Sequence, residues 1–369
     1  MTRMQSLWIR SIFLLPLAAL GSCSDSPTEP GAPVSADVFV LNSTGQTLAS
    51  FSVLEGLERE ASPIDLGAGF DGDAFDLTES FAVTTVSAFG GSRILFVDRA
   101  SGDVLTTAFP APESDLANPS AASFDARGTA WVGGRGSNAI YRASPGDATA
   151  ERVAGGLGTF IERVIPHGNR LYVVDANIDD DGGSYEPLGP GRIVVLSMAG
   201  EQEDVITLPP AALNPTEAVV SGGSLLVLAS GTFDPTTFLP SNDGSVVAVD
   251  MATGSAGSPV PLDANGVSLE LGTDGFVYVT TTSDYQSLEL LRFDPVSGVF
   301  QRGPADPITV TGEQGGRVDC WSATGLADGR IVCVTFSFAE AGRLVLADRD
   351  GGFIDEVASG FGSTDVALP

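Results

Sequence analysis

LYVVDANIDDDGGSYEPLGPGRIVVL, residues 171–196, holds two short apolar segments separated by a polar, glycine-rich break. The same pairing returns as LLVLA and SVVAVD (225–250), VYVTTT and LELLRFD (277–294), and IVCV and RLVLADRD (331–350). Two earlier pairs, FAVTTV with RILFVD (81–98) and AWVGG with AIYRA (130–143), fit the same frame. Short runs rich in β-branched residues and bounded by Gly, Asn and Asp are typical of β-strands. The sequence therefore predicts a repeated antiparallel strand unit.

The length of the repeat indicates the architecture. Seven units between residues 37 and 369 give about 48 residues each, within the range of β-propeller blades. Outside the N-terminal leader no window keeps a 3.6-residue apolar period, so few helices are expected. We predict an all-β, seven-bladed propeller; six blades with an extra hairpin is the alternative.

The two ends of the repeat region complement each other. DVFVLNSTG, QTLASFSVL and REASPIDLG (37–67) supply three strands but no innermost strand, whereas GSTDVALP (362–369) supplies one strand after a complete blade. We expect these segments to share the seventh blade, which closes the ring without an exposed sheet edge.

Residues 1–22 have the features of a leader. Arg3 and Arg10 precede SIFLLPLAAL (11–20), which is too short to span a bilayer but typical of a signal-peptide core. LGSC (20–23) resembles a bacterial lipobox, and this implies a lipoprotein acylated at Cys23. Ser24 follows that cysteine, so the resemblance implies retention at the outer membrane of the cell envelope. Residues 23–36 are polar and proline-rich, as expected for a tether, and residues 37–369 form the propeller domain.

The repeats also resemble a known class. VFVLNSTGQTLASFSVL and AWVGGRGSNAIYRASPGD resemble the YVTN and NHL-type propeller repeats of bacterial surface proteins. The resemblance covers nearly the whole mature chain and implies a binding or scaffold module. The propeller fold alone does not define a function, because propellers serve many purposes.

Charge limits the partners. The chain has 47 acidic residues against 18 basic ones, every one of them Arg, for a net charge of −29. Such a surface repels nucleic acid and attracts cations, cationic peptides or neutral sugars. We expect a monomer that binds a protein, peptide or carbohydrate.

Two loops between paired strands, 175–191 and 230–244, are much longer than the others and belong to neighbouring blades. Long loops on a rigid scaffold often carry function. Asp234 and Asp243 in the second loop, with Trp321 at the start of an inner strand, are candidates for ligand contact. Trp321 could stack on a sugar or be buried between blades.

The first loop resembles an EF-hand calcium loop. Asp175, Asn177, Asp179 and Glu186 occupy positions 1, 3, 5 and 12 of that frame, and Asp181 would contribute its backbone carbonyl. Asp180 stands where the frame needs Gly, and no helices flank the loop. Bound Ca²⁺ and a solvated acidic loop remain the two readings.

The sequence has few of the residues that commonly act in catalysis. The chain has one histidine, His167, and no lysine, which disfavours a Ser-His-Asp triad, a histidine metal site and Schiff-base chemistry. The alternative function is a metal-dependent hydrolase or lactonase similar to the SMP-30-type propellers, which use Glu, Asn and Asp around a divalent ion. Candidates near the inner strands are Asn118, Asn214, Asn265, Glu162, Glu217 and Asp319.

Cys320 and Cys333 flank the LADGRI turn of one blade. An oxidising envelope compartment permits a disulfide between them. A two-residue turn at Asp328-Gly329 would place Cys333 opposite Thr324, whereas a looser turn would bring the cysteines together. The sequence leaves both outcomes open.

Overall fold

The computed structural model describes residues 36–67, 74–87, 91–111, 117–179, 186–337 and 339–369. The leader, Cys23 and the tether up to residue 35 lie outside these ranges, as do Asp180 and Asp181. Strands make up all the regular structure of the described residues, which contain no helix long and apolar enough to cross a membrane.

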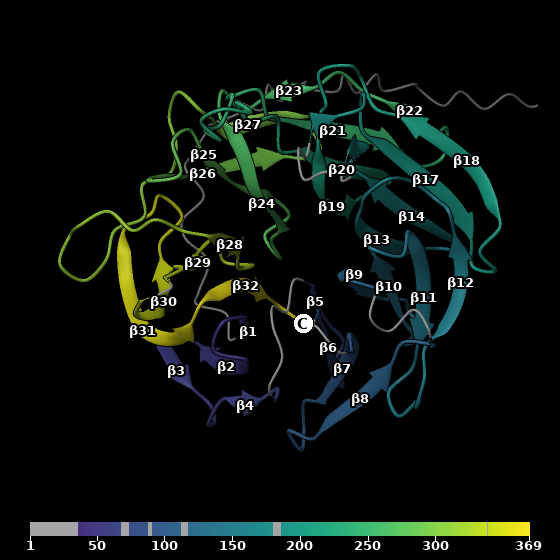
Figure 1. Cartoon of the computed structure of the whole chain (residues 1–369). Helices are drawn as coiled ribbons and strands as arrows, with labels where there is room; N and C mark the ends of the chain where they lie inside the picture. The colour runs from purple at the N-terminus through teal and green to yellow at the C-terminus, as the bar shows by residue number, and fades with distance from the viewer. Residues whose placement is uncertain (1–35, 68–73, 88–90, 112–116, 180–185, 338) are drawn as a thin grey trace, which may run out of the picture. The chain divides into compact units, whose positions relative to one another are not determined.

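The strands form seven small antiparallel sheets, the blades of a β-propeller, which confirms the predicted fold (Figure 1). In chain order the first six blades are β5–β8 (Phe75–Leu77, Phe81–Val86, Arg93–Asp98, Val104–Ala108), β9–β12 (Pro119–Phe124, Ala130–Gly134, Ala139–Ala143, Glu151–Gly155), β13, β14, β17 and β18 (Ile161–His167, Arg170–Asp175, Arg192–Ser197, Gln202–Thr207), β19–β23 (Pro215–Ser221, Ser224–Ala229, Ser245–Asp250, Ser255–Ala256, Val260–Pro261), β24–β27 (Asn265–Leu271, Val277–Thr282, Leu288–Asp294, Val299–Arg302) and β28–β31 (Ser322–Gly325, Ile331–Val334, Ala341–Ala347, Phe353–Phe361).

The seventh blade joins the two ends of the chain. β1 (Ala36–Asn42), β2 (Thr47–Val53), β3 (Leu57–Arg59) and β4 (Ile64–Asp65) form its outer part, and β32 (Ser363–Ala367) pairs with β1 as the innermost strand. A buried network fixes this closure: the Ser363 hydroxyl donates to Asn42 Oδ1 at 2.7 Å, and Asn42 Nδ2 donates to the Ser359 carbonyl at 3.2 Å. The ring therefore closes through side-chain as well as backbone hydrogen bonds.

The middle strands are buried on both faces because each blade packs between two others. In β14 and β17, Leu171, Val173, Val194 and Leu196 pack with Trp131 and Ile140 of the preceding blade. The alternate side chains Tyr172, Val174, Ile193 and Val195 pack with Leu225 and Val227 of the next. The two-residue period of a strand thus places one set of side chains in each interface.

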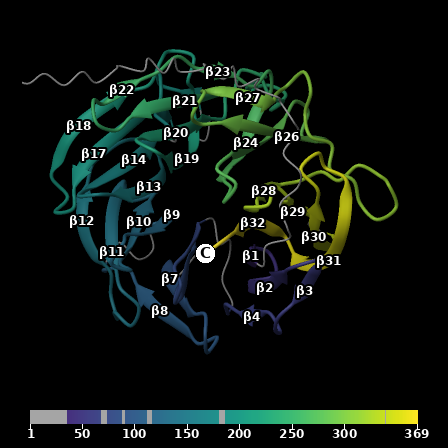
Figure 2. The ribbon, with the colours of Figure 1, turned by 180° about the vertical axis from the view of Figure 1, so that it is seen from behind.

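The innermost strands surround the centre of the ring. Going round, β5, β9, β13, β19, β24, β28 and β32 each contact the next, and β32 contacts β5 (Figures 1 and 2). We call the end that carries the 230–244 loop the loop face. The end that carries the turn at residues 168–169 is the turn face.

Candidate functional site: the central channel

Two cavities enter the ring along its innermost strands. The loop-face chamber, of about 230 Å³, is lined near that face by Val267, Trp321 and Thr364. The turn-face chamber, of about 390 Å³, is lined by residues nearer the other ends of the strands, including His167 and Leu368. Both cavities share Arg163, Glu217, Glu270 and Asp365, which we call the belt. The belt therefore lies where the two chambers meet.

One ion pair of the belt is complete. Arg163 on β13 donates from Nε and Nη2 to the two carboxylate oxygens of Glu217 on the neighbouring β19. Burial raises the pKa of Glu217, and the Arg163 charge opposes that shift. A fork-to-fork pair uses both oxygens of its carboxylate. Both oxygen atoms of the Glu217 carboxylate are therefore occupied by Arg163.

The other two carboxyl groups of the belt have no cation of their own. Within the described residues no hydrogen bond or ion pair reaches the Glu270 carboxylate, and Asp365 accepts only a long bond from Ser322 Oγ, 3.5 Å, besides the backbone N–H of Val366. Burial, followed by the charges of Asp365 and Glu217, raises the pKa of Glu270 well above its usual range. Burial likewise raises the pKa of Asp365 to about 7. These two groups can hold protons or a ligand cation near neutral pH.

The loop-face chamber also contains unused hydroxyl groups. Ser268 is only 8% exposed, and its Oγ has no hydrogen-bond partner within the described structure. The buried Oγ1 of Thr364 also has no partner there. Trp321 lines the same cavity, half-buried, with its ring 5.0 Å from that of Phe336. Buried polar groups are normally paired, so these hydroxyls point to a missing partner.

A fourth carboxyl group, Asp76 on β5, lines the turn-face chamber. Its Oδ2 accepts the backbone N–H of Phe124 on the neighbouring inner strand at 2.7 Å, and its Oδ1 accepts that of Leu77 at 2.8 Å. Burial raises the pKa of Asp76, and these two hydrogen bonds oppose the shift. Asp76 thus helps to join two blades while it adds negative charge to the channel.

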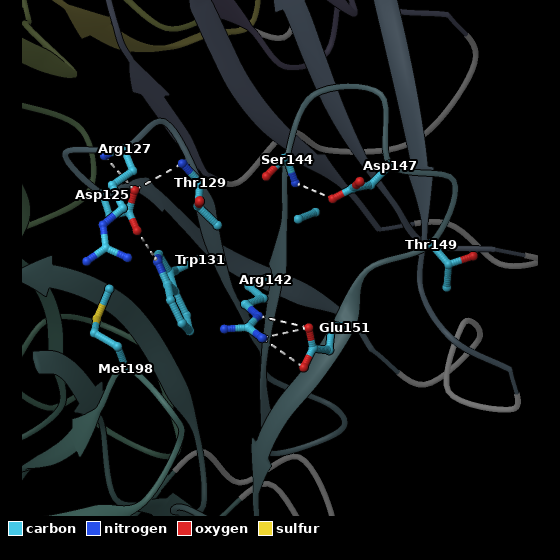
Figure 3. A pocket seen from close by; sticks show the side chains of 11 residues that line it. Asp125, Arg127, Thr129, Trp131, Arg142, Ser144, Asp147, Thr149, Glu151 and Met198 are labelled. Atoms are coloured by element: carbon cyan, nitrogen blue, oxygen red, sulfur yellow. Dashed lines mark hydrogen bonds and ion pairs between the residues drawn. The ribbon is translucent and has the colours of Figure 1, made fainter. Parts of the chain in front are cut away.

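A further groove, of about 420 Å³, lies outside the channel between two blades (Figure 3). In this groove Arg142 forms a two-point ion pair with Glu151, and Asp125 accepts a hydrogen bond from Trp131 Nε1 at 3.2 Å. The groove is larger than either chamber, but the channel has the unmatched carboxylates. We therefore take the channel as the candidate site.

The long loop at 230–244 is held by its own acidic residues. Asp234 accepts backbone N–H bonds from Thr236 and Thr237, and Asp243 accepts bonds from the backbone and the hydroxyl of Thr232. These carboxylates shape the loop. Phe233 of this loop stacks on Tyr285 of the neighbouring blade, with the ring centroids 6.0 Å apart. Of the predicted ligand-face residues, only Trp321 lines the channel.

The residues of the predicted calcium loop have other bonds. Asp175 is fully buried, pairs with Arg192, and accepts backbone N–H bonds from Thr159 and Phe160. The side chain of Asn177 donates to the Pro190 carbonyl. Asp179 and Glu186 face each other in a small hairpin formed by β15 (Ile178–Asp179) and β16 (Glu186–Pro187), whereas Asp181 lies outside the described residues. Calcium at this loop stays a prediction.

The residues considered for a metal-dependent enzyme are separated. Glu162 pairs with Arg135 at 2.6 Å, and Asp319 lies 3.3 Å from Arg317. Asn118 and Asn214 occupy left-handed turn positions, and Asn265 hydrogen-bonds the 232–242 backbone. In the described part of the chain no group of three or more His, Cys, Asp or Glu side chains is placed to hold a metal ion. Of these candidates, only Glu217 belongs to the belt.

Cys320 and Cys333 form a disulfide with their Cα atoms 5.6 Å apart. The turn between their strands is looser than two residues, since the Leu326 N–H donates to the Arg330 carbonyl. Cys333 lies opposite Ala323, so the idea that it faces Thr324 is wrong. Before β28 the chain shifts, and the Trp321 N–H donates to the Val334 carbonyl. The disulfide therefore lies directly beside the tryptophan of the channel.

The sequence interpretation missed Glu270 and Asp365, although a signal was present. Each innermost strand is short and mainly apolar, yet five of the seven carry a charged residue facing the channel: Asp76, Arg163, Glu217, Glu270 and Asp365. A channel-facing charge inside most of the apolar inner strands is the pattern that would have identified the belt.

No protein-family model matches this chain, and no match was found among curated proteins. The YVTN/NHL resemblance and the lipoprotein assignment therefore remain predictions. Comparison with solved structures, in contrast, finds many matching chains.

A "putative 6-phosphogluconolactonase" from Bacteroides fragilis is 11% identical, covers 94% of this chain and 100% of its own, and superposes with a TM-score of 0.62. A protein of the same description from Bacteroides uniformis is 11% identical over 91% of this chain and 99% of its own, with a TM-score of 0.60. Virginiamycin B lyase from Staphylococcus aureus is 11% identical over 78% and 83%, with a TM-score of 0.55. At this level of identity the likeness establishes the β-propeller fold alone.

Proposed function

We propose that this chain is a lipid-anchored binding protein of the cell envelope with its ligand site in the central channel of the propeller. The observation that carries the proposal is the pair of belt carboxyl groups, Glu270 and Asp365, which form no ion pair with any residue that the structure describes. Buried charges are normally paired, and the cost of leaving them unpaired is large. A ligand that compensates them would bind favourably.

A matched comparison tests the channel as the ligand site. Full-length protein and a Ser268→Trp variant, whose indole would fill the loop-face chamber, are purified in detergent and equilibrated with a small-molecule extract. We expect mass spectrometry to find compounds retained by the unmodified protein and lost from the variant. Identical retained compounds in the two proteins would contradict the channel proposal. Thermal unfolding of the variant checks that it remains folded.

The loop face is the second part of the proposal. Phe238 is 68% exposed and Tyr285 is 54% exposed, and both adopt left-handed backbone conformations, which are rare for bulky residues. Exposed aromatic side chains beside carboxylates suit contact with a peptide or carbohydrate partner.

The membrane anchor is a separate part of the proposal and rests on the LGSC segment. Replacement of Cys23 by serine should release the protein from the membrane fraction and abolish incorporation of a labelled fatty acid. Retention of the label would contradict acylation at this residue. Placement at the outer membrane rests on Ser24 in the same way.

A metal-dependent hydrolase or lactonase is the second candidate. Four carboxyl groups in one channel favour it, and the two Bacteroides proteins of the same fold are each described as a "putative 6-phosphogluconolactonase". Hydrolysis of sugar lactones, assayed with and without divalent cations, tests this function. Activity that depends on the metal and is lost in a Glu270→Gln variant would favour the enzyme over the binding protein.

A further inference from the structure

Beside the Arg163–Glu217 pair, three kinds of chemical group line the loop-face chamber: two carboxyl groups without a cation among the described residues, two hydroxyl groups without a partner among them, and one indole ring. They come from three inner strands or the chain next to them, β24, β28 and β32. Each kind of group limits which ligand fits.

The charge of the belt calls for a cation. With Arg163 and Glu217 neutralising each other, Glu270 and Asp365 bring up to two negative charges to the same place. A neutral sugar would remove water from these carboxylates without balancing their charge, which is unfavourable. A cationic ligand balances it.

The hydrogen-bonding groups favour an ammonium ion. A primary ammonium group carries three N–H donors and no acceptor. The carboxylates of Glu270 and Asp365 and the free oxygen atoms of Ser268 and Thr364 can accept these donors. The Trp321 indole can pack against the carbon chain or attract the charge through its ring face.

We propose that the loop-face chamber binds a primary organic ammonium ion between Glu270 and Asp365, with its carbon chain beside Trp321. This inference rests on the proposed function of the channel and names its ligand class. The chamber volume of about 230 Å³ equals about seven or eight water molecules, so the bound group is short.

Binding of the cation should release protons. The groups that face Glu270 are Asp365, Glu217 and Asp76, which disfavour its ionised form, and Arg163, which favours it. A bound ammonium ion adds a second favourable charge and shifts both carboxyl groups toward ionisation. Affinity for the ammonium ion should therefore fall on acidification, by up to about tenfold per pH unit for each displaced proton.

Calorimetric titration of the full-length protein in detergent tests the ligand class. The probes are 1-aminobutane, 1,4-diaminobutane and 1-butanol, at pH 8 and pH 5.5. We expect both amines to bind at least tenfold more tightly than the alcohol at pH 8, and more weakly at pH 5.5. Glu270→Gln should weaken amine binding at least tenfold, whereas Glu313→Gln, an exposed residue outside the channel, should leave it unchanged.

Equal affinity for the alcohol and the amines, or amine binding unchanged by Glu270→Gln, would overturn the ammonium proposal. A glucose titration separates this failure from failure of the channel as a ligand site. Glucose binding that Ser268→Trp abolishes, without amine binding, would refute the ammonium ligand and keep the channel site. An absence of any binding sensitive to Ser268→Trp would refute both.

Discussion

Arg163 and Glu217 form a two-point ion pair that joins the innermost strands of neighbouring blades. Because this pair uses the one arginine of the belt, Glu270 and Asp365 form no ion pair in the described part of the chain. The same contact therefore stabilises the ring and leaves two carboxyl groups whose negative charge a bound cation would balance.

Loss of the arginine should destabilise the protein strongly. Arg163→Met leaves Glu217 as a buried, unpaired charge, and such changes cost about 3–5 kcal/mol of unfolding free energy. The loss should be smaller at pH 5, where the carboxyl groups of the belt take up protons. Urea denaturation at pH 8 and pH 5 measures both values.

The double variant Arg163→Met/Glu217→Gln is the control for this prediction. Removal of the second charge should recover part of the lost stability. A double variant no more stable than Arg163→Met alone would show that the ion pair is not the source of the loss.

The pKa of Asp365, raised to about 7, predicts how stability depends on pH. A carboxyl group with a higher pKa in the folded chain binds more protons when folded, so the free energy of unfolding falls as pH rises from about 4 to 7. Glu270, whose pKa is also raised, acts in the same direction. Asp365→Asn should flatten this dependence and raise stability at pH 8 by on the order of 1 kcal/mol.

Denaturant unfolding of both proteins between pH 4 and pH 8 measures this effect. The two proteins should have similar stabilities at pH 4 and should diverge toward pH 8. Parallel curves over the whole range would show that Asp365 titrates normally.

The disulfide should contribute to stability. The bond closes a loop with a sequence separation of 13 residues between Cys320 and Cys333, and loop entropy suggests about 3 kcal/mol. A Cys320→Ser/Cys333→Ser variant should unfold at a lower denaturant concentration, and a reducing agent should no longer affect it. Equal sensitivity of both proteins to the reducing agent would mean that the bond does not form in solution.

Asp175 should act as a structural residue. Its carboxylate joins Arg192 to the backbone of residues 159 and 160 in a fully buried position. Asp175→Asn should therefore cost about 2 kcal/mol of unfolding free energy in the presence of EDTA. A loss that appears only when Ca²⁺ is present would instead assign the residue to an ion.

The same measurement tests the calcium loop. Under that prediction, excess Ca²⁺ raises the unfolding temperature above its value in EDTA by mass action, and Asp179→Asn removes the rise. The absence of a rise in the unmodified protein would eliminate the calcium prediction.

The fold could be predicted from the sequence because many residues carry the same signal. Each blade repeats its apolar strands and its Gly, Asn and Asp turns, so errors at single positions do not change the result. The shared seventh blade could be predicted by counting strands. The N-terminal repeat segment supplies three strands without an innermost strand, and the C-terminal segment supplies one strand beyond a complete blade.

The channel was harder to predict because its residues are single and distant in sequence. Glu270 and Asp365 lie 95 positions apart in the numbering, and only ring closure brings them together. The acidic segment at 175–186 was instead predicted to be a site because its carboxylates are close together in sequence. In the structure, Asp175 turned out to be engaged by Arg192, which lies just beyond that loop.

The most direct test of the channel site is a crystal structure of the protein soaked with 1,4-diaminobutane. We expect density for the ligand in the loop-face chamber, with one nitrogen atom within hydrogen-bond distance of Glu270 or Asp365. An empty chamber in crystals where the diamine occupies other sites, such as the groove beside Arg142 and Glu151, would contradict it.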